Sequence, residues 1–221
     1  PRSTLFPYTT LFLSNQRPTL EEEFKLIQGL NKSTGKHIGV YVEVKEPAFH
    51  EKEGKDIMKA VIGMMDKYGY NKPEAKSILQ IFDYEAVKGA RDKGWKGELC
   101  MLVDMDGQML KDDKERHKWL LTPEGIADIA QYATIYAPWF SHMAEPNEDG
   151  TGYKINQVAE LAHRHGMKVH SWTHRSDKNF KGFKSSDEAL DVAFGQLKLD
   201  GLFSDFPGDV VAYLKKKGLR D

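Results

Sequence analysis

The sequence predicts an α/β protein built on a parallel sheet, and three observations lead to this expectation. Six short apolar runs have the length of β-strands, and amphipathic helical segments alternate with them along the chain. Helix-to-strand joints are short and centred on glycine, whereas several strand-to-helix joints are long and polar. No low-complexity linker interrupts the alternation. The pattern therefore indicates repeated βα units within one domain.

Helix signals begin with Thr19 and Glu22, which have the spacing of a capping box, and apolar residues then recur at helical spacing up to Gly35. Asp83 is placed to cap a later helix, and Thr122 followed by a proline marks the start of another. The expected helices cover residues 19–35, 54–68, a segment after residue 83, and residues 122–133, 155–166, 186–201 and 210–217.

Strand signals are short runs rich in β-branched and aromatic residues. The expected strands cover residues 38–45, 77–83, 98–104, 134–139, 168–174 and 201–207. Long polar connections over 104–121, 138–154 and 174–185 leave the carboxyl ends of these strands. In parallel α/β proteins that end of the sheet is where ligands bind, so we expect the working face there.

Composition excludes several classes of protein. The 221 residues are 40% hydrophobic and carry a formal net charge of -1, so no basic excess supports a nucleic-acid binder. Cys100 is the single cysteine, which excludes an intramolecular disulfide and a thiolate metal cluster. No run reaches the roughly 18 apolar residues of a membrane span. We therefore expect neither a nucleic-acid partner nor a membrane span.

Residues 1–14 differ from the rest of the chain. Pro7, Thr9 and Thr10 interrupt their apolar run, unlike the continuous apolar region of a signal peptide, so no signal peptide is visible. The stretch resembles translated adapter sequence of the kind found at the ends of assembled contigs. We interpret residues 1–14 as a non-native segment and assign residues 15–221 to the domain.

Two charged residues end the first expected strand. Valines occupy one face of this strand, and Tyr41, Glu43 and Lys45 occupy the other. Glu43 and Lys45 could pair with each other at a solvated strand end. They could also form a metal-ligating carboxylate beside an anion-binding ammonium, which suits a phosphorylated substrate. The strand alone leaves both interpretations open.

Several motifs together carry a family resemblance. They are TLEEEFKLIQGLNKSTGKHIGVYVEVKEPAFHEKEGKDI, SILQIFD, HSWTHRSD and GLFSDFP, in this order and spacing. From Thr19 to the C-terminus the chain resembles the periplasmic-type glycerophosphodiester phosphodiesterases. The resemblance implies a (β/α)8 TIM barrel and hydrolysis of a small-molecule glycerophosphodiester to glycerol 3-phosphate and an alcohol. It also implies a periplasmic or secreted location.

The same resemblance assigns roles to individual residues. It makes Glu43 a ligand of a metal ion, usually Ca²⁺ and sometimes Mg²⁺, and Lys45 a phosphate contact. Trp172 resembles the aromatic position that packs against the substrate glycerol, although it could equally be a core residue. Gln80 and Phe82 share a face of their strand. We expect them to line the site, Gln80 by hydrogen bonding and Phe82 by contact.

The resemblance is incomplete upstream. In the family, the first strand carries a His-Arg pair followed by Glu, and the second carries a Glu-x-Asp pair with a second His shortly after. None of these motifs precedes Thr19, and six βα units stand against the eight of a complete barrel. We therefore expect an incomplete (β/α)8 barrel that lacks the first two βα units. No catalytic residue is retained, so we expect this C-terminal fragment to be inactive.

The histidines of this chain lie at other positions. His170, Trp172 and His174 share one face of their strand, and we interpret His170 as a hydrogen-bonded core histidine. His142 follows a strand and could approach the working face. Asp205 is placed to cap the last helix. A separate set, namely His37, His50 and His117, lies in polar stretches and is expected at the surface, and His163 and His165 lie at a helix end.

Two other functions remain open. Glu43 and Asp104 could be the acid and nucleophile of a TIM-barrel glycosidase, although Lys45 beside Glu43 argues against that assignment. The chain could also be a non-catalytic barrel relative that binds a phosphorylated ligand.

Overall fold

The structure is a computed structural model that describes residues 18–104 and 114–220. The segment 1–14, interpreted above as non-native, lies outside these residues. The described residues contain one parallel sheet of six strands in the order β1-β2-β3-β4-β7-β8. These strands are β1 (Val40–Val44), β2 (Ser77–Ile81), β3 (Glu98–Val103), β4 (Ile135–Pro138), β7 (Lys168–His174) and β8 (Gly201–Ser204).

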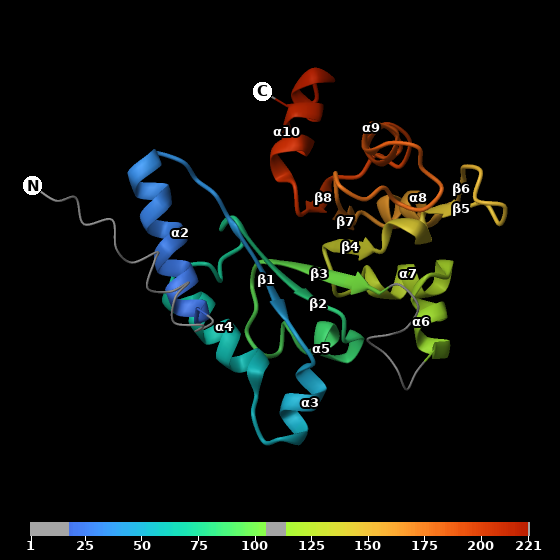
Figure 1. Cartoon of the computed structure of the whole chain (residues 1–221). Helices are drawn as coiled ribbons and strands as arrows, with labels where there is room; N and C mark the ends of the chain where they lie inside the picture. The colour runs from blue at the N-terminus through green and yellow to red at the C-terminus, as the bar shows by residue number, and fades with distance from the viewer. Residues whose placement is uncertain (1–17, 105–113, 221) are drawn as a thin grey trace, which may run out of the picture.

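Helices follow the strands and cover one face of the sheet (Figure 1). The α-helices are α2 (Leu20–Thr34), α3 (Pro47–Lys52), α4 (Ile57–Lys67), α5 (Tyr84–Gly89), α6 (Lys114–Leu120), α7 (Pro123–Ile129), α8 (Val158–Arg164), α9 (Ser186–Leu190) and α10 (Pro207–Lys216). A 3-10 turn, η1 (Phe140–His142), and a π-helix, η2 (Asp191–Gln196), complete the helical segments. None of the helices in the described ranges combines the length and the apolar character that a membrane crossing needs.

The sheet is curled. Tyr41 on β1 and Phe203 on β8 belong to strands at opposite ends of the strand order, yet their ring centroids are 4.8 Å apart. Their contact requires the two ends of the sheet to bend toward each other. The predicted fold class is therefore confirmed, because the six parallel strands form the curled sheet of an incomplete (β/α)8 barrel.

Local capping signals act as predicted. Thr19 accepts the backbone N–H of Glu22, and the Glu22 carboxylate accepts the backbone N–H of Thr19, which completes the capping box. Asp83 accepts the N–H of Ala86 at 2.9 Å and starts α5. Thr122 caps α7, with a proline at the first helical position. These bonds satisfy N–H groups that would otherwise lack partners at the helix starts.

The connection after β4 differs from the expected loop. It contains η1 and a small antiparallel hairpin of β5 (Ala144–Pro146) and β6 (Tyr153–Ile155). Ile155, predicted inside a helix, lies in β6 and is 40% exposed. Helix α8 starts only at Val158, where the Asn156 side chain accepts the backbone N–H.

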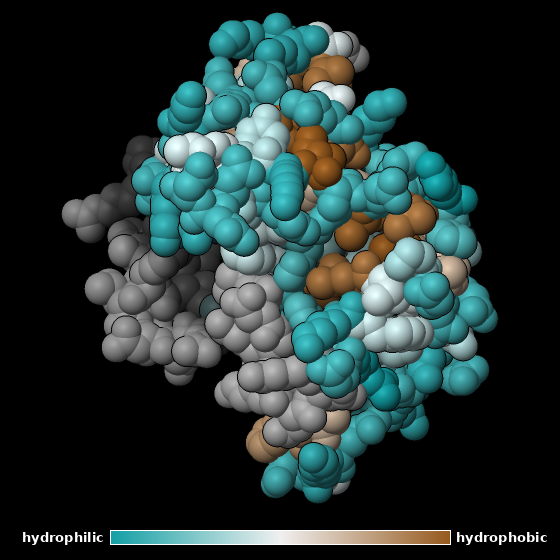
Figure 2. All heavy atoms as spheres, turned by 90° about the vertical axis from the view of Figure 1, so that its right-hand side faces the viewer, coloured by the Kyte–Doolittle hydropathy of each residue, from teal (hydrophilic) through white to brown (hydrophobic). Residues whose placement is uncertain are grey.

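The side of the molecule that carries this hairpin is largely hydrophilic, with hydrophobic residues gathered in recesses (Figure 2).

The predicted cap of the last helix is wrong. Phe206 occupies the N-cap position of α10 and makes no side-chain capping bond. Asp205 instead pairs with Arg175, whose Nη1 lies 2.7 Å from its Oδ2. The guanidinium thus draws the carboxylate away from the helix N-terminus.

Each strand divides its side chains between two buried layers. Leu79 and Ile81 of β2 and Leu99 and Met101 of β3 are fully buried against the helices. On the other face lies a smaller cluster that consists of Cys100, Leu102, Ile135 and Ala137, packed with Tyr41, Ile78, Phe82 and Trp172. Each buried aliphatic side chain contributes about 1.5–3 kcal/mol relative to an exposed one. The division confirms the predicted alternation along β1, where Val40 and Val44 face the helices.

Gly125 permits a close approach within the helix layer. A Cβ at this position would lie 1.9 Å from the main-chain oxygen of Trp119. We expect Gly125→Ala to lower the free energy of unfolding by about 1–3 kcal/mol, because backbone atoms must shift. Gly63 on α4 has no atom within 4 Å of such a Cβ, so Gly63→Ala is the control and should stabilise by about 0.5–1 kcal/mol. Urea unfolding measures both, and equal stability of the two variants would contradict the packing argument.

Two strands form the edges of the described sheet. β1 and β8 each pair with one neighbour, so each leaves backbone groups that another chain could pair with.

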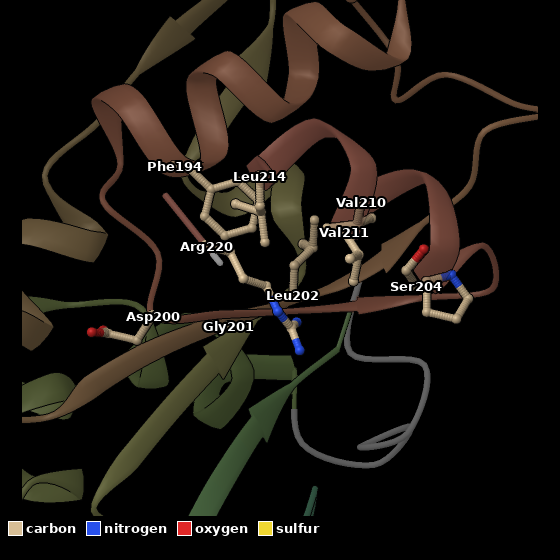
Figure 3. A pocket seen from close by; sticks show the side chains of 10 residues that line it. Phe194, Asp200, Gly201, Leu202, Ser204, Val210, Val211, Leu214 and Arg220 are labelled. Carbon is tan, nitrogen blue, oxygen red and sulfur yellow. The ribbon is translucent and has the colours of Figure 1, made fainter. Parts of the chain in front are cut away.

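An apolar cavity of about 380 Å³ lies beside β8 on the helix side of the sheet (Figure 3). It is lined mainly by Phe194, Leu202, Val210, Val211 and Leu214.

We expect these edges to make the chain self-associate as its concentration rises. Ile38, two residues before β1, is 60% exposed, so Ile38→Lys should weaken association by placing a charge beside that edge. Phe49→Lys, on the similarly exposed Phe49 of α3, is the control and should leave association unchanged. Sedimentation velocity over a concentration series tests this, and a wild-type chain that stays monomeric throughout would rule the prediction out.

Candidate active site

Glu43 and Lys45 lie together at the carboxyl end of β1. Lys45 Nζ is 3.3 Å from Glu43 Oε1, and the two side chains are 68% and 23% exposed, respectively. The side chains therefore project to the same side of the sheet, as the alternation of the strand predicts. The structure therefore shows the ion pair of the first interpretation. Both groups also lie at the carboxyl end of the sheet, where the working face is predicted.

One oxygen of Glu43 lacks a hydrogen bond. Oε1 is shielded from solvent and accepts no hydrogen bond from the described residues, so the Lys45 contact is an ion pair without hydrogen-bond geometry. A carboxylate oxygen removed from water in this way is unfavourable unless a donor or a cation compensates it. In this structure the Lys45 ammonium is the cation beside it, and no hydrogen bond from the described residues would compete with a metal ion there.

The next two predicted residues lie beside this pair. Gln80 is the register neighbour of Glu43 on β2 and is buried. Phe82 extends the same face by two residues and makes an edge contact with Trp172, with ring centroids 5.6 Å apart. The structure therefore brings Glu43, Gln80, Phe82 and Trp172 to one side of the sheet.

Trp172 is anchored to the sheet and packs on its interior face. Its indole N–H donates to the main-chain oxygen of Ala137 at 3.0 Å, which ties the ring to β4. The ring packs on the interior cluster but stays half-buried. Trp172 is thus held in place by β4 while the residue stays partly exposed.

His170 is a core histidine, as predicted. Its Nδ1 lies 3.1 Å from the Tyr41 hydroxyl, and burial lowers the pKa of His170 to about 4. The ring is therefore neutral near pH 7. Gly201 on β8 allows the ring to fit, because a Cβ there would lie 2.7 Å from the His170 ring.

His174 does not share the face of His170, contrary to the prediction. The register between β7 and β8 shifts between Ser171 and His174, so the alternation does not extend to the strand end. His174 is buried and hydrogen-bonds to the hydroxyl oxygens of Ser204 and Ser186, at 3.0 and 2.7 Å. Its role is to join β7 to β8 and α9.

His117 was expected at the surface and is buried. It is 7% exposed, and its Nε2 lies 2.9 Å from the main-chain oxygen of Asp104 and 3.1 Å from Asp104 Oδ1. The prediction is wrong because the polar stretch around His117 forms helix α6, which carries the imidazole to the end of β3. A signal was present, since Leu120 and Leu121 follow His117 at the spacing of one buried helix face.

His142 approaches the same group. Its Nε2 lies 2.6 Å from the main-chain oxygen of Asp104, and its ring centroid is 5.4 Å from that of His117. The expectation that His142 comes near the carboxyl end of the sheet is therefore met, and the end of β3 is a partner that spacing did not identify.

The described residues alone do not form a complete metal site. They contain no group of three or more histidine, cysteine or carboxylate side chains that could hold an ion. Calcium takes about six to eight oxygen ligands. Oε1 of Glu43, which accepts no hydrogen bond from the described residues, fits one position of such a set, and the remaining ligands would have to come from other residues.

The neutral His170 makes stability depend on pH. The unfolded histidine has a pKa near 6.5, so between that value and about 4 the unfolded chain binds a proton that the folded chain does not. Lowering the pH from 7 to 5 should therefore reduce the free energy of unfolding by about 2 kcal/mol through this residue.

Urea unfolding at the two pH values measures this loss in wild type and in His170→Gln, which should show a smaller difference. Some difference will remain, because burial also lowers the pKa of His174. His37→Gln changes an exposed histidine and serves as the control. An identical pH dependence in wild type and His170→Gln would contradict the assignment.

Comparisons with known proteins match one family. A model of the glycerophosphoryl diester phosphodiesterase family matches residues 9–209. A glycerophosphodiester phosphodiesterase of Haemophilus influenzae is 32% identical over 213 residues, which cover 89% of this chain and 58% of the relative. The chain thus spans somewhat more than half of the length of that relative.

Solved structures show the same fold. A proposed glycerophosphoryl diester phosphodiesterase of Silicibacter pomeroyi superposes with a TM-score of 0.61 at 18% identity, covering 92% of this chain and 58% of that one. A phosphodiesterase of Oleispira antarctica, solved with sn-glycerol-3-phosphate, gives 0.54 at 16% identity, covering 90% and 61%. Because the family model matches most of the length of this chain, the chain belongs to the glycerophosphoryl diester phosphodiesterase family.

Proposed function

We propose that this chain provides part of an enzyme that hydrolyses glycerophosphodiesters, with the help of a metal ion, to glycerol 3-phosphate and an alcohol. The observation that carries the proposal is the Glu43–Lys45 ion pair at the carboxyl end of β1, in which Glu43 Oε1 accepts no hydrogen bond from the described residues. The glycerol 3-phosphate bound to the Oleispira antarctica phosphodiesterase supports the class of ligand. We place the enzyme in the periplasm or outside the cell.

Each site residue has a proposed task. The Lys45 ammonium contacts the phosphate, and Glu43 supplies one oxygen ligand to Ca²⁺, with Mg²⁺ as the alternative. When bound, the cation neutralises negative charge on the phosphate. Gln80 hydrogen-bonds to the substrate, and Phe82 and Trp172 contact its carbon skeleton.

We propose that the chain by itself is inactive. Diester cleavage needs groups that take a proton from the nucleophile and give one to the leaving alkoxide. Among the described histidines near the carboxyl end, His117 and His142 are directed at a main-chain oxygen, and His174 is bound to two serine hydroxyls. No catalytic residue is therefore assigned within the described residues.

A second candidate is a non-catalytic relative that binds a phosphorylated ligand, and the engagement of these imidazoles favours it. The glycosidase alternative is weaker. Its two carboxylates would be Glu43 and Asp104, and these already contact Lys45 and His117, respectively.

Binding of glycerol 3-phosphate to the chain tests the ligand site. We expect Lys45→Met to weaken the affinity about tenfold or more, because a charge-assisted hydrogen bond to phosphate is lost. Lys168→Met is the matched control, since Lys168 pairs with Glu98 at the opposite end of the sheet, and it should bind as wild type does. Calorimetric titration measures all three, with and without Ca²⁺. Equal affinities of wild type and Lys45→Met would reject the phosphate role.

Turnover separates the two candidates. The chain alone should release no glycerol 3-phosphate from a glycerophosphodiester. A chimera that adds the part of the Haemophilus influenzae relative left unmatched by this chain should release it with Ca²⁺, and Glu43→Gln should abolish that release. A folded chimera that binds glycerol 3-phosphate but never turns over would favour the non-catalytic relative.

A further inference from the structure

We propose that His117 and His142 are positioning residues of the ligand site and act through a shared bond to the main-chain oxygen of Asp104. We call this arrangement the Asp104 clamp. The inference rests on the proposed function, because it assigns the clamp an effect on binding of the phosphorylated ligand.

The geometry of the clamp is well defined. Nε2 of His142 and Nε2 of His117 lie 2.6 and 2.9 Å from one carbonyl oxygen. A carbonyl oxygen accepts but never donates, so both nitrogens must carry the proton. Its two lone pairs allow both bonds at once. Asp104 and His117 are almost completely buried. Water therefore cannot easily replace these hydrogen bonds, and breaking one costs free energy.

The clamp joins three segments at the carboxyl side of the sheet. Asp104 directly follows β3, His117 belongs to α6, and His142 ends η1, which follows β4. Two separate strand-to-helix connections are thus bound to the end of one strand. Connections on this side of a parallel sheet form the ligand site in related architectures.

A continuous series of contacts links the clamp to the proposed ligand residues. The His142 ring makes an edge contact with Trp139, with centroids 5.7 Å apart. Trp139 pairs through its backbone with Trp172, and Trp172 contacts Phe82. Loss of the His142 bond should therefore let Trp139 move, and with it the aromatic surface offered to the ligand.

Substitutions that remove or keep the donor test the proposal. Leucine at either histidine removes the N–H, whereas His142→Gln and His117→Gln keep an N–H at a similar reach. The control is His163→Leu, which removes an imidazole bond to Asp200 on the helix-to-strand side of the sheet. Two readouts are taken on the complete chain: the affinity for glycerol 3-phosphate, and the NMR signal of the Trp139 indole N–H, assigned with Trp139→Phe.

We expect both leucine variants to shift the Trp139 signal and to weaken binding about three- to tenfold, the range of one lost hydrogen bond. Both glutamine variants should restore signal and affinity, and His163→Leu should change neither. Folded leucine variants with unchanged signal and affinity would overturn the proposal. Glutamine variants as impaired as leucine would overturn it as well, because the loss would then come from ring packing.

The experiment also separates this inference from the proposed function. A wild-type chain that binds no glycerol 3-phosphate would refute the ligand site proposed for this chain, and with it the effect of the clamp on affinity, whereas turnover by the chimera tests the proposed function. The Trp139 signal would then still decide whether the histidines hold this part of the site, because that readout needs no ligand.

Discussion

The structure depends on one constraint, the burial of both faces of a parallel sheet. Helices cover one face through residues such as Leu79 and Met101, and the curl of the sheet covers the other through residues such as Tyr41 and Cys100. A strand buried on both faces can carry unpaired charge only at its ends, since desolvating a charge within the sheet is costly. This constraint places Glu43 and its lysine partner at the mouth of the curled sheet.

The filled interior sets the floor of the site. Tyr41 lies two residues before Glu43 on the same face and contacts both Phe203 and His170. Three large rings therefore occupy the space below the charged pair. A histidine belongs in this layer only as a neutral group, and burial lowers its pKa accordingly. A ligand is thus restricted to the carboxyl edge, where Phe82 and Trp172 remain half-buried.

Sequence patterns predicted the features that depend on local periodicity. The six strands, the caps at Thr19, Asp83 and Thr122, and the common face of Glu43 and Lys45 all follow from spacing within one segment. The features that were missed depend on residues far apart in the chain, as with the bonds of His117 and His142 to the end of β3 and the pairing of Asp205 with Arg175. His174 shows a further limit, because a register shift against β8 reversed its expected face. Spacing within a segment carries no information on such partners.

The two interpretations of the Glu43–Lys45 pair are compatible in physical terms. An ion pair in which Lys45 is 68% exposed contributes about 0–1 kcal/mol, because water screens it and the long side chain loses freedom. A phosphate that takes the ammonium and a cation that takes the carboxylate would therefore displace little stabilising energy. The buried Oε1 of Glu43 accepts no hydrogen bond from the described residues, so a bound cation would replace Lys45 in compensating its charge once the ammonium turns to the phosphate. An ion pair in the free chain is thus the arrangement expected of groups that separate when a phosphate and a metal ion bind together.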